Sequence, residues 1–314
     1  MQLPIELRLA IEREASVFSP AALAASAAAL SSAYRKGKGR PNISGAESVA
    51  YALVRMPATY ACIRSVLSDL APCESLLDLG AGPGTTGWAA AASWESLRTI
   101  TLVEREHALG ALGRRLAAES ETEALRHARW ISEDITRVSS FEPHDAVVLS
   151  YALGEFASDV RLRIVETAWR AARKALILIE PGTTPGFSLI RDMRSHLVAG
   201  GARIVAPCPH NKPCPIPEGD WCHFAARVER TALHRKLKGG EMSYEDEKFS
   251  YVAVYRDAAE PARARIIRRP VKEPGLIQLV LCGQEGIAQA RIRKRDSLRW
   301  PAARKSVWGD PWDF

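Results

Sequence analysis

A short apolar run followed by a glycine-rich turn limits the possible folds more than any other part of the chain. Residues 76–79 (LLDL) lead directly into residues 80–84 (GAGPG). The run has the length and apolar character of a buried strand, and glycine can take the positive φ angles that a tight turn beside a ligand requires. A helix is expected to begin near Thr85, with its first N–H groups pointing back at the turn. A strand, a tight turn and a helix in this order begin a doubly wound α/β sheet.

The same alternation of apolar runs and helical patterns continues to about residue 200. The expected strands are residues 75–79, 99–104, 130–134, 145–151 and 175–180. Between them lie Ala- and Arg-rich segments with helical spacing, such as residues 106–120 and 157–174. This alternation predicts a parallel sheet with helices on both faces. Ligands of such sheets bind beyond the carboxyl ends of the strands, so the glycine-rich turn is the expected ligand site.

The spacing of the glycines indicates which ligand this site takes. Asp78 precedes glycines 80, 82 and 84 in the form D-x-G-x-G-x-G, which predicts a class I methyltransferase fold, Rossmann-like, that holds S-adenosylmethionine. The predicted cofactor-binding residues lie in the turn and at the ends of the following strands: Asp78, Gly80, Gly82, Gly84, Glu104 for the ribose hydroxyls, Asp134 for the adenine amino group, and Ser150. Residues 82–87 also match G-x-G-x-x-G, a weak dinucleotide pattern, but this match begins two residues late. A structural turn without a ligand is the remaining alternative.

Three of the six cysteines lie in a segment that is rich in proline. Five prolines between residues 207 and 217 exclude a helix and a central strand there. The cysteines are Cys208, Cys214 and Cys222, and Cys282 follows at the end of an expected strand. Four thiolates satisfy either tetrahedral zinc or an iron–sulfur cluster. The wide spacing favours a cluster, because zinc sites usually contain short C-x2-4-C pairs.

The remaining residues with metal-binding side chains are interpreted as structural. His210 and His223 each neighbour a cysteine and are expected beside the metal site or at the surface. Cys62 and Cys73 are expected to be small buried hydrophobes.

Charge is concentrated late in the chain. The net charge is +7 over 314 residues, and residues 261–305 hold twelve Lys and Arg against three Asp and Glu. Such a segment suits the phosphates of a nucleic acid, with an aromatic ring to stack on a base; the alternative is a solvated basic strand and tail. The residues proposed for this contact are Arg291, Arg293, Lys294, Arg295, Arg299 and Trp300.

Other features bear on compartment and organisation. The beginning of the chain shows no secretory signal, and the Ala-rich residues 21–30 are too short for a membrane span. We therefore expect a cytosolic protein, a monomer without a membrane partner. Four regions are expected: an N-terminal helical region at 1–70, the Rossmann-like core at 71–200, the Cys- and Pro-rich segment at 201–247, and C-terminal strands with a basic tail at 248–314.

Several of these pieces, taken in order, resemble a known family. The pieces are Tyr51 with RMPATY at 55–60, the turn at 76–84, the cysteine segment at 207–224, Leu281-Cys282 and the tail at 305–310. They resemble the methyltransferase-like assembly-factor family of the small ribosomal subunit, found in mitochondria and in related bacteria. The resemblance implies a 4Fe-4S cluster on Cys208, Cys214, Cys222 and Cys282. It also implies binding to the small ribosomal subunit and its rRNA, with the eukaryotic relatives in the mitochondrial matrix. Within such a family, the absence of a targeting segment at the beginning of this sequence is expected of a bacterial cytosolic member.

Catalysis cannot be assigned from the sequence. Enzymes that methylate exocyclic amines often place a Pro-Pro-aromatic box after the fourth strand, where residues 150–155 read SYALGE. Glu155 is a candidate general base, and a carboxylate at a helix N-terminus is an equally good interpretation. Three hypotheses therefore follow: an RNA-binding assembly factor that uses S-adenosylmethionine as a ligand, an active methyltransferase of small-subunit rRNA, and a methyltransferase of a protein or small molecule with a structural zinc site.

Overall fold

The structure is a computed structural model that describes residues 1–35, 42–238, 242–257 and 261–314. The chain divides into two compact units: residues 1–176 with 226–247, and residues 177–225 with 248–314. Three strands, β5 (Ala172–Pro181), β7 (Phe224–Glu229) and β8 (Tyr244–Tyr255), each pass from one unit into the other.

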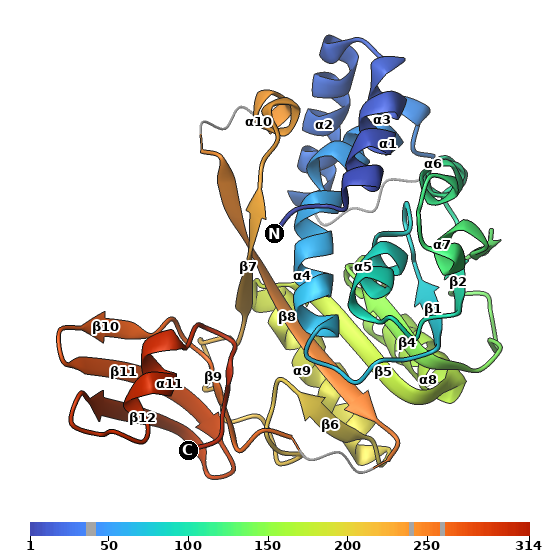
Figure 1. Cartoon of the computed structure of the whole chain (residues 1–314). Coiled ribbons are helices and arrows are strands. Elements are labelled where there is room, and N and C mark those ends of the chain that lie inside the picture. Colours follow the sequence, from blue (N-terminus) through green and yellow to red (C-terminus); the bar gives the residue numbers. More distant parts are fainter. Residues whose placement is uncertain (36–41, 239–241, 258–260) are drawn as a thin grey trace. The chain divides into compact units, whose positions relative to one another are not determined.

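Helices occupy most of the beginning of the first unit (Figure 1). They are α1 (Ile5–Ser16), α2 (Pro20–Arg35), α3 (Gly45–Val54) and α4 (Met56–Leu67). Ser44 and Glu47 form a capping box that fixes the start of α3, and Pro57 in the first turn of α4 follows the break at Arg55. A late segment, α10 (Ala232–Lys238), packs on α2 and α3. No described helix is by itself long and apolar enough to cross a membrane; α1 and the first part of α2 reach that length only when counted together across a 111° bend.

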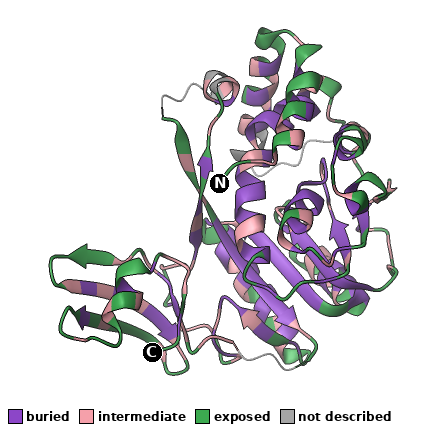
Figure 2. Ribbon diagram, in the orientation of Figure 1, coloured by how far each residue is buried: buried purple, intermediate pink, exposed green. Residues whose placement is uncertain are grey.

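The first sheet has the strand order of class I methyltransferases. Four strands pair in parallel: β1 (Ser75–Leu79), β2 (Thr99–Val103), β3 (Arg129–Ile131) and β4 (His144–Ser150). The full order is β3-β2-β1-β4-β5-β8-β6, and β8 runs antiparallel to β6 (Arg203–Ala206). A parallel sheet with a reversed strand after β5 confirms the predicted class I S-adenosylmethionine methyltransferase fold. Residues 76–79 of β1 are almost completely buried, as expected of a central strand (Figure 2).

Helices follow these strands as the alternation predicts. They are α5 (Thr85–Ser93), α6 (His107–Ala118), the short α7 (Glu123–Arg126), α8 (Ser158–Ala171) and α9 (Thr184–Ala199), with a 3-10 turn η1 (Leu153–Glu155) after β4. Trp130 in β3 packs tightly against two glycines: a Cβ atom at Gly113 would lie 2.2 Å from the Trp130 ring, and one at Gly84 would lie 3.1 Å from it. Glycine at both positions therefore lets β3, α6 and the end of the turn approach one another closely.

The second unit contains a small antiparallel sheet of its own. Its strands are β9 (Ala264–Ile266), β10 (Val271–Glu273), β11 (Leu276–Gly283), β12 (Gly286–Arg293) and β13 (Pro311–Trp312), in the order β10-β11-β9-β13 with β12 paired to β11. Alternate residues of β11 form a core with Ile266, Ile292 and Trp312, and α11 (Trp300–Lys305) contributes Ala303 to it. The proline-rich residues 207–223 contain neither helix nor strand, as predicted.

Candidate functional site

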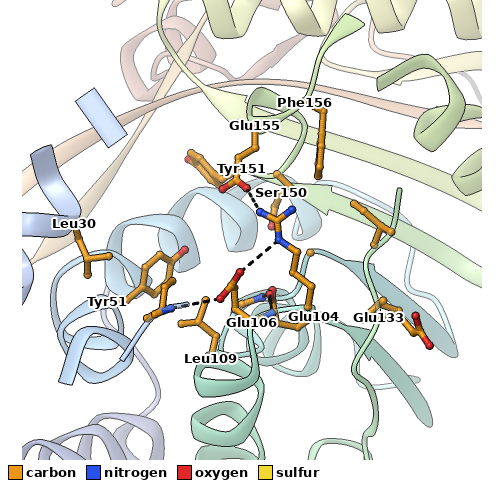
Figure 3. A pocket seen from close by; sticks show the side chains of 17 residues that line it. Leu30, Tyr51, Glu104, Glu106, Leu109, Glu133, Ser150, Tyr151, Glu155 and Phe156 are labelled. Carbon is orange, nitrogen blue, oxygen red and sulfur yellow. Dashed lines mark hydrogen bonds and ion pairs between the residues drawn. The ribbon is translucent and has the colours of Figure 1, made fainter. Parts of the chain in front are cut away.

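A pocket opens at the carboxyl ends of β1, β2 and β4, within the first unit (Figure 3). Gly80 and Gly82 follow β1, residues 104–106 follow β2, and residues 150–152 follow β4; Leu30 and Tyr51 come from α2 and α3. Gly80, Gly82 and Gly84 all have positive φ angles, of 78°, 54° and 84°, which explains why the turn needs glycine. A Cβ atom at Gly82 would meet no atom within 4 Å, so the space beside this residue is open.

Glu104 links the turn to the end of β2. Its carboxylate accepts hydrogen bonds from the backbone N–H groups of Gly82 and Glu106, both at 2.7 Å. Burial raises the pKa of Glu104, and these two amide hydrogen bonds oppose the rise. A carboxylate has about four acceptor positions, so Glu104 keeps the capacity to accept further hydrogen bonds on the pocket side.

Asp78 is a fully buried carboxyl group at the end of β1. Neither of its oxygens has a hydrogen-bond partner among the described residues. Burial raises the pKa of Asp78 to about 7, and the nearby Thr86 hydroxyl partly opposes the rise. Thr86 Oγ1 also lies 3.1 Å from the hydroxyl of Ser150, a residue of the pocket lining. The pocket is therefore flanked by a buried acid whose charge the protein itself does not balance.

Arg105 reaches across the pocket. Its guanidinium forms an ion pair with Glu155 at 3.1 Å and lies 3.6 Å from the carboxylate of Glu106, and dashed lines in Figure 3 mark both contacts. It also lies 4.0 Å from the carboxylate of Asp134. The ring of Phe156 lies 5.9 Å from it. Burial raises the pKa of Glu155, and Arg105 opposes this rise. Glu155, the candidate general base, is therefore paired with the guanidinium of Arg105.

Asp134 differs from its predicted position. The sequence placed it at the end of the third strand, but β3 ends at Ile131. Asp134 lies in the following loop, where its Oδ1 accepts hydrogen bonds from the N–H and hydroxyl of Thr136, at 2.9 and 2.8 Å. Its neighbours Glu133 and Ile135 line the pocket.

Three pocket residues were not predicted to bind the cofactor: Tyr51, Arg105 and Tyr151. Tyr151 directly follows β4 and has a φ angle of 56°, which is rare for a bulky residue and typical of functional sites. Its buried hydroxyl lies beside the Cys62 thiol. Burial raises the pKa of Tyr51 to about 12. The position of Arg105 directly after β2 was a usable signal, because residues at strand ends face the ligand in this fold.

The four predicted metal-ligating cysteines lie around one cavity of the second unit. Cys208, Cys214, Cys222 and Cys282 all line it. Buried Phe187, Ile216 and Ile267 pack together with Cys282 and with the partly buried Cys214 and Cys222. Burial, together with the neighbouring Cys208 and Cys214, raises the pKa of Cys282 to about 12. In the described residues, no group of three or more His, Cys, Asp or Glu side chains is arranged to hold a single metal ion.

The predicted RNA-contacting residues fall into two groups. Arg291 and Arg293 are exposed on β12, where they pair with Gln278 and Leu276 of β11 and so share one face of the sheet. Arg299 instead forms an ion pair with Asp296 at 2.6 Å. Trp300 packs against the core of the small sheet. Trp300 is partly buried by this packing, and its role in stacking on a base stays a prediction.

Comparisons with known proteins agree with this description. A profile of the family described as mitochondrial small ribosomal subunit Rsm22 matches residues 45–313. The chain is similar to the human "Ribosome assembly protein METTL17, mitochondrial", with 31% identity over 256 residues that cover 76% of this chain and 55% of the relative. It is also similar to the "Rsm22-cox11 tandem protein 2, mitochondrial" of Schizosaccharomyces pombe, with 25% identity, covering 83% of this chain and 42% of the relative. The chain thus spans about half the length of these curated relatives.

Solved structures with a similar fold are much more distant in sequence. One is a magnesium protoporphyrin IX methyltransferase from Synechocystis with bound SAH, with 13% identity and a TM-score of 0.44, covering 71% of this chain and 92% of that chain. Another is a putative RNA methyltransferase from Pyrococcus horikoshii, with 11% identity and a TM-score of 0.42, covering 62% of this chain and 80% of that chain.

Proposed function

Because the chain belongs to the family described as mitochondrial small ribosomal subunit Rsm22, we propose that it is an assembly factor of the small ribosomal subunit that binds S-adenosylmethionine, carries a 4Fe-4S cluster and contacts rRNA. The observation that carries the proposal is the pocket at the ends of β1, β2 and β4, with an unbalanced buried acid beside it. The cluster and the rRNA contact rest on separate observations in the second unit.

The pocket residues fit the chemistry of S-adenosylmethionine. Asp78 would balance the positive charge of the methionine part, which accounts for a buried carboxyl group without a partner in the described residues. Glu104 would accept from the ribose hydroxyls, and Gly80, Gly82 and Gly84 would let the cofactor approach the backbone. Asp134 and Ser150 would bind near the adenine. The cofactor, when bound, would supply an activated methyl group.

The cysteine cavity fits an iron–sulfur cluster. A 4Fe-4S cluster takes one thiolate on each of four irons, and four free cysteines surround this cavity with apolar side chains between them. The irregular residues 207–223 have no ladder of backbone hydrogen bonds to hold them, so metal binding would be coupled to their folding. Structural zinc remains the competing assignment.

The environment of Glu155 favours an assembly factor over an enzyme. A general base must be free to accept a proton, whereas Arg105 holds this carboxylate at 3.1 Å. We therefore propose that the cofactor serves mainly as a bound ligand of an assembly factor. Methyl mapping of small-subunit rRNA from cells with and without the gene tests this point, because a methyl group that disappears with the gene would identify an enzyme instead.

Cofactor binding is tested by calorimetry with a matched pair of glycine variants. Gly82 and Gly201 both have positive φ angles, and at both positions a Cβ atom would enter open space, but only Gly82 lines the pocket. Gly82→Val should abolish binding of S-adenosylmethionine, whereas Gly201→Val carries the same backbone strain and should leave binding intact. Binding that survives in Gly82→Val would show that the cofactor lies elsewhere.

The cluster is tested by metal analysis. Protein purified without oxygen should be brown and contain iron and acid-labile sulfide, and Cys214→Ser should lose both. Cys73→Ser is the matched control, because Cys73 is buried in the first unit beside the backbone carbonyl of Ala71. Colourless protein with stoichiometric zinc would exclude the cluster.

A further inference from the structure

Arg194 of α9 is a buried cation at the edge of the cysteine cavity. Its side chain lines the cavity, and the residue is only 3% exposed. Its Nη2 donates hydrogen bonds to the backbone carbonyls of His210 and Lys212, at 2.9 and 2.7 Å. Both carbonyls belong to the loop that joins Cys208 to Cys214. One guanidinium therefore holds the segment that presents two of the four thiols.

The charge of Arg194 has no counter-ion in the part of the chain that the structure describes. No ion pair joins a described carboxylate to it, and its Nε has no hydrogen-bond partner there. A buried charge without a partner is costly, so an anionic group is expected in the adjoining cavity. Cys208 lines the same cavity as Arg194, so its thiol and this guanidinium face one space.

A second buried arginine contacts the residue that precedes Cys208 in the sequence. Arg265 of β9 is 5% exposed, and it donates from Nε to the carbonyl of Pro207 at 3.1 Å and from Nη1 to that of Gly309 at 2.9 Å. Pro207 directly precedes Cys208 in the sequence. Arg268, by contrast, is paired with Asp220. Positive charge is thus concentrated near Cys208, and Arg194 is the member that lines the cavity.

We propose that Arg194 is the positioning residue that balances the charge of the group held by the four cysteines and thereby raises its reduction potential. The inference rests on the proposed iron–sulfur cluster. One-electron reduction adds one negative charge to the cavity, and a fixed cation beside Cys208 stabilises the reduced form more than the oxidised form. Net charge and hydrogen bonds to the sulfurs are the means by which proteins set the potentials of such centres.

The test compares three variants of the full chain, purified without oxygen and titrated with dithionite while absorbance and EPR spectra are recorded. Arg194→Gln should lower the equilibrium constant for reduction at least tenfold. For one electron, this corresponds to a reduction potential about 59 mV lower. Arg194→Lys keeps the charge and should stay within roughly threefold of the wild type. Arg299→Gln removes an exposed charge paired with Asp296 in the same unit and should leave the potential unchanged.

The outcomes separate this inference from the proposal beneath it. A wild-type protein without iron and sulfide would refute the cluster itself and this inference with it. A complete cluster with a wild-type potential in Arg194→Gln would refute the role of Arg194 and leave the cluster standing. Loss of the cluster in both Arg194→Gln and Arg194→Lys would show that Arg194 supplies only hydrogen bonds to the loop, which also overturns the inference.

Discussion

Replacing Asp78 by Asn should change how the stability of the cofactor-free protein depends on pH. The pKa of Asp78 rises from 3.8 to about 7 on folding, because the carboxyl group is buried and has no hydrogen-bond partner among the described residues. Between these values the folded state binds a proton that the unfolded state has released, so the free energy of unfolding falls as pH rises. One unit of pKa corresponds to about 1.4 kcal/mol, and part of this titration falls outside the measured range, so between pH 4.5 and pH 8 the wild type should lose about 3 kcal/mol that Asp78→Asn does not lose.

Urea unfolding of both proteins from pH 4.5 to pH 8 measures this difference. All other titrating groups are shared, so they cancel when the two curves are subtracted. Parallel curves would refute the argument, because they would mean that Asp78 ionises equally easily in both states. In the wild type, saturating S-adenosylmethionine should flatten the curve, since a cation beside Asp78 favours its ionised form.

The remaining predictions concern packing and RNA binding. Gly113→Ala should destabilise the protein by about 1–3 kcal/mol, because its Cβ would overlap the Trp130 ring at 2.2 Å. Gly110→Ala on the same helix is the control, since its Cβ would meet no such obstacle. Equal urea midpoints for the two variants would contradict this explanation. The double variant Arg291→Gln with Arg293→Gln should bind small-subunit rRNA more weakly. The slope of log K against log salt concentration should become shallower by about one for each phosphate that the protein no longer neutralises. Filter binding from 50 to 200 mM salt measures this slope, and an unchanged slope would exclude both residues from the RNA-binding surface.

The strands of the core could be predicted well because their signals are local. β1 begins and ends as predicted, since a buried run of four residues is stopped by glycine. β5 begins three residues earlier than predicted, because Arg173 and Lys174 are exposed residues of the strand and their charges resemble the preceding helix. The short β7 and α10 were missed because they lie in residues 201–247, which the prolines led us to interpret as irregular; the alternating burial of β7 was a usable signal.

The site was only partly predictable, because tertiary contacts decide it. The glycines and Glu104 could be placed from spacing, since backbone conformation and strand ends follow from the sequence. The ion pair that holds Glu155 depends on Arg105 reaching from another strand end, and no local pattern encodes that contact. Trp300 is an aromatic residue among basic ones, which suggested stacking on a base. Its packing against the core of the small sheet depends on the tertiary fold and could not be read from the sequence.

The packing of α10 on α2 and α3 has a consequence for the order of synthesis. The first unit is made of residues 1–176 and 226–247, so its last piece is translated only after 49 intervening residues. Because α10 ends at Lys238, at about 5–20 residues per second the N-terminal helices wait roughly 3–12 s for it after residue 176 has been made. During that interval the surface of α2 and α3 that later receives α10 stays uncovered. A nascent chain stalled before residue 226 should therefore be more sensitive to protease in α2 and α3 than one stalled well beyond residue 247.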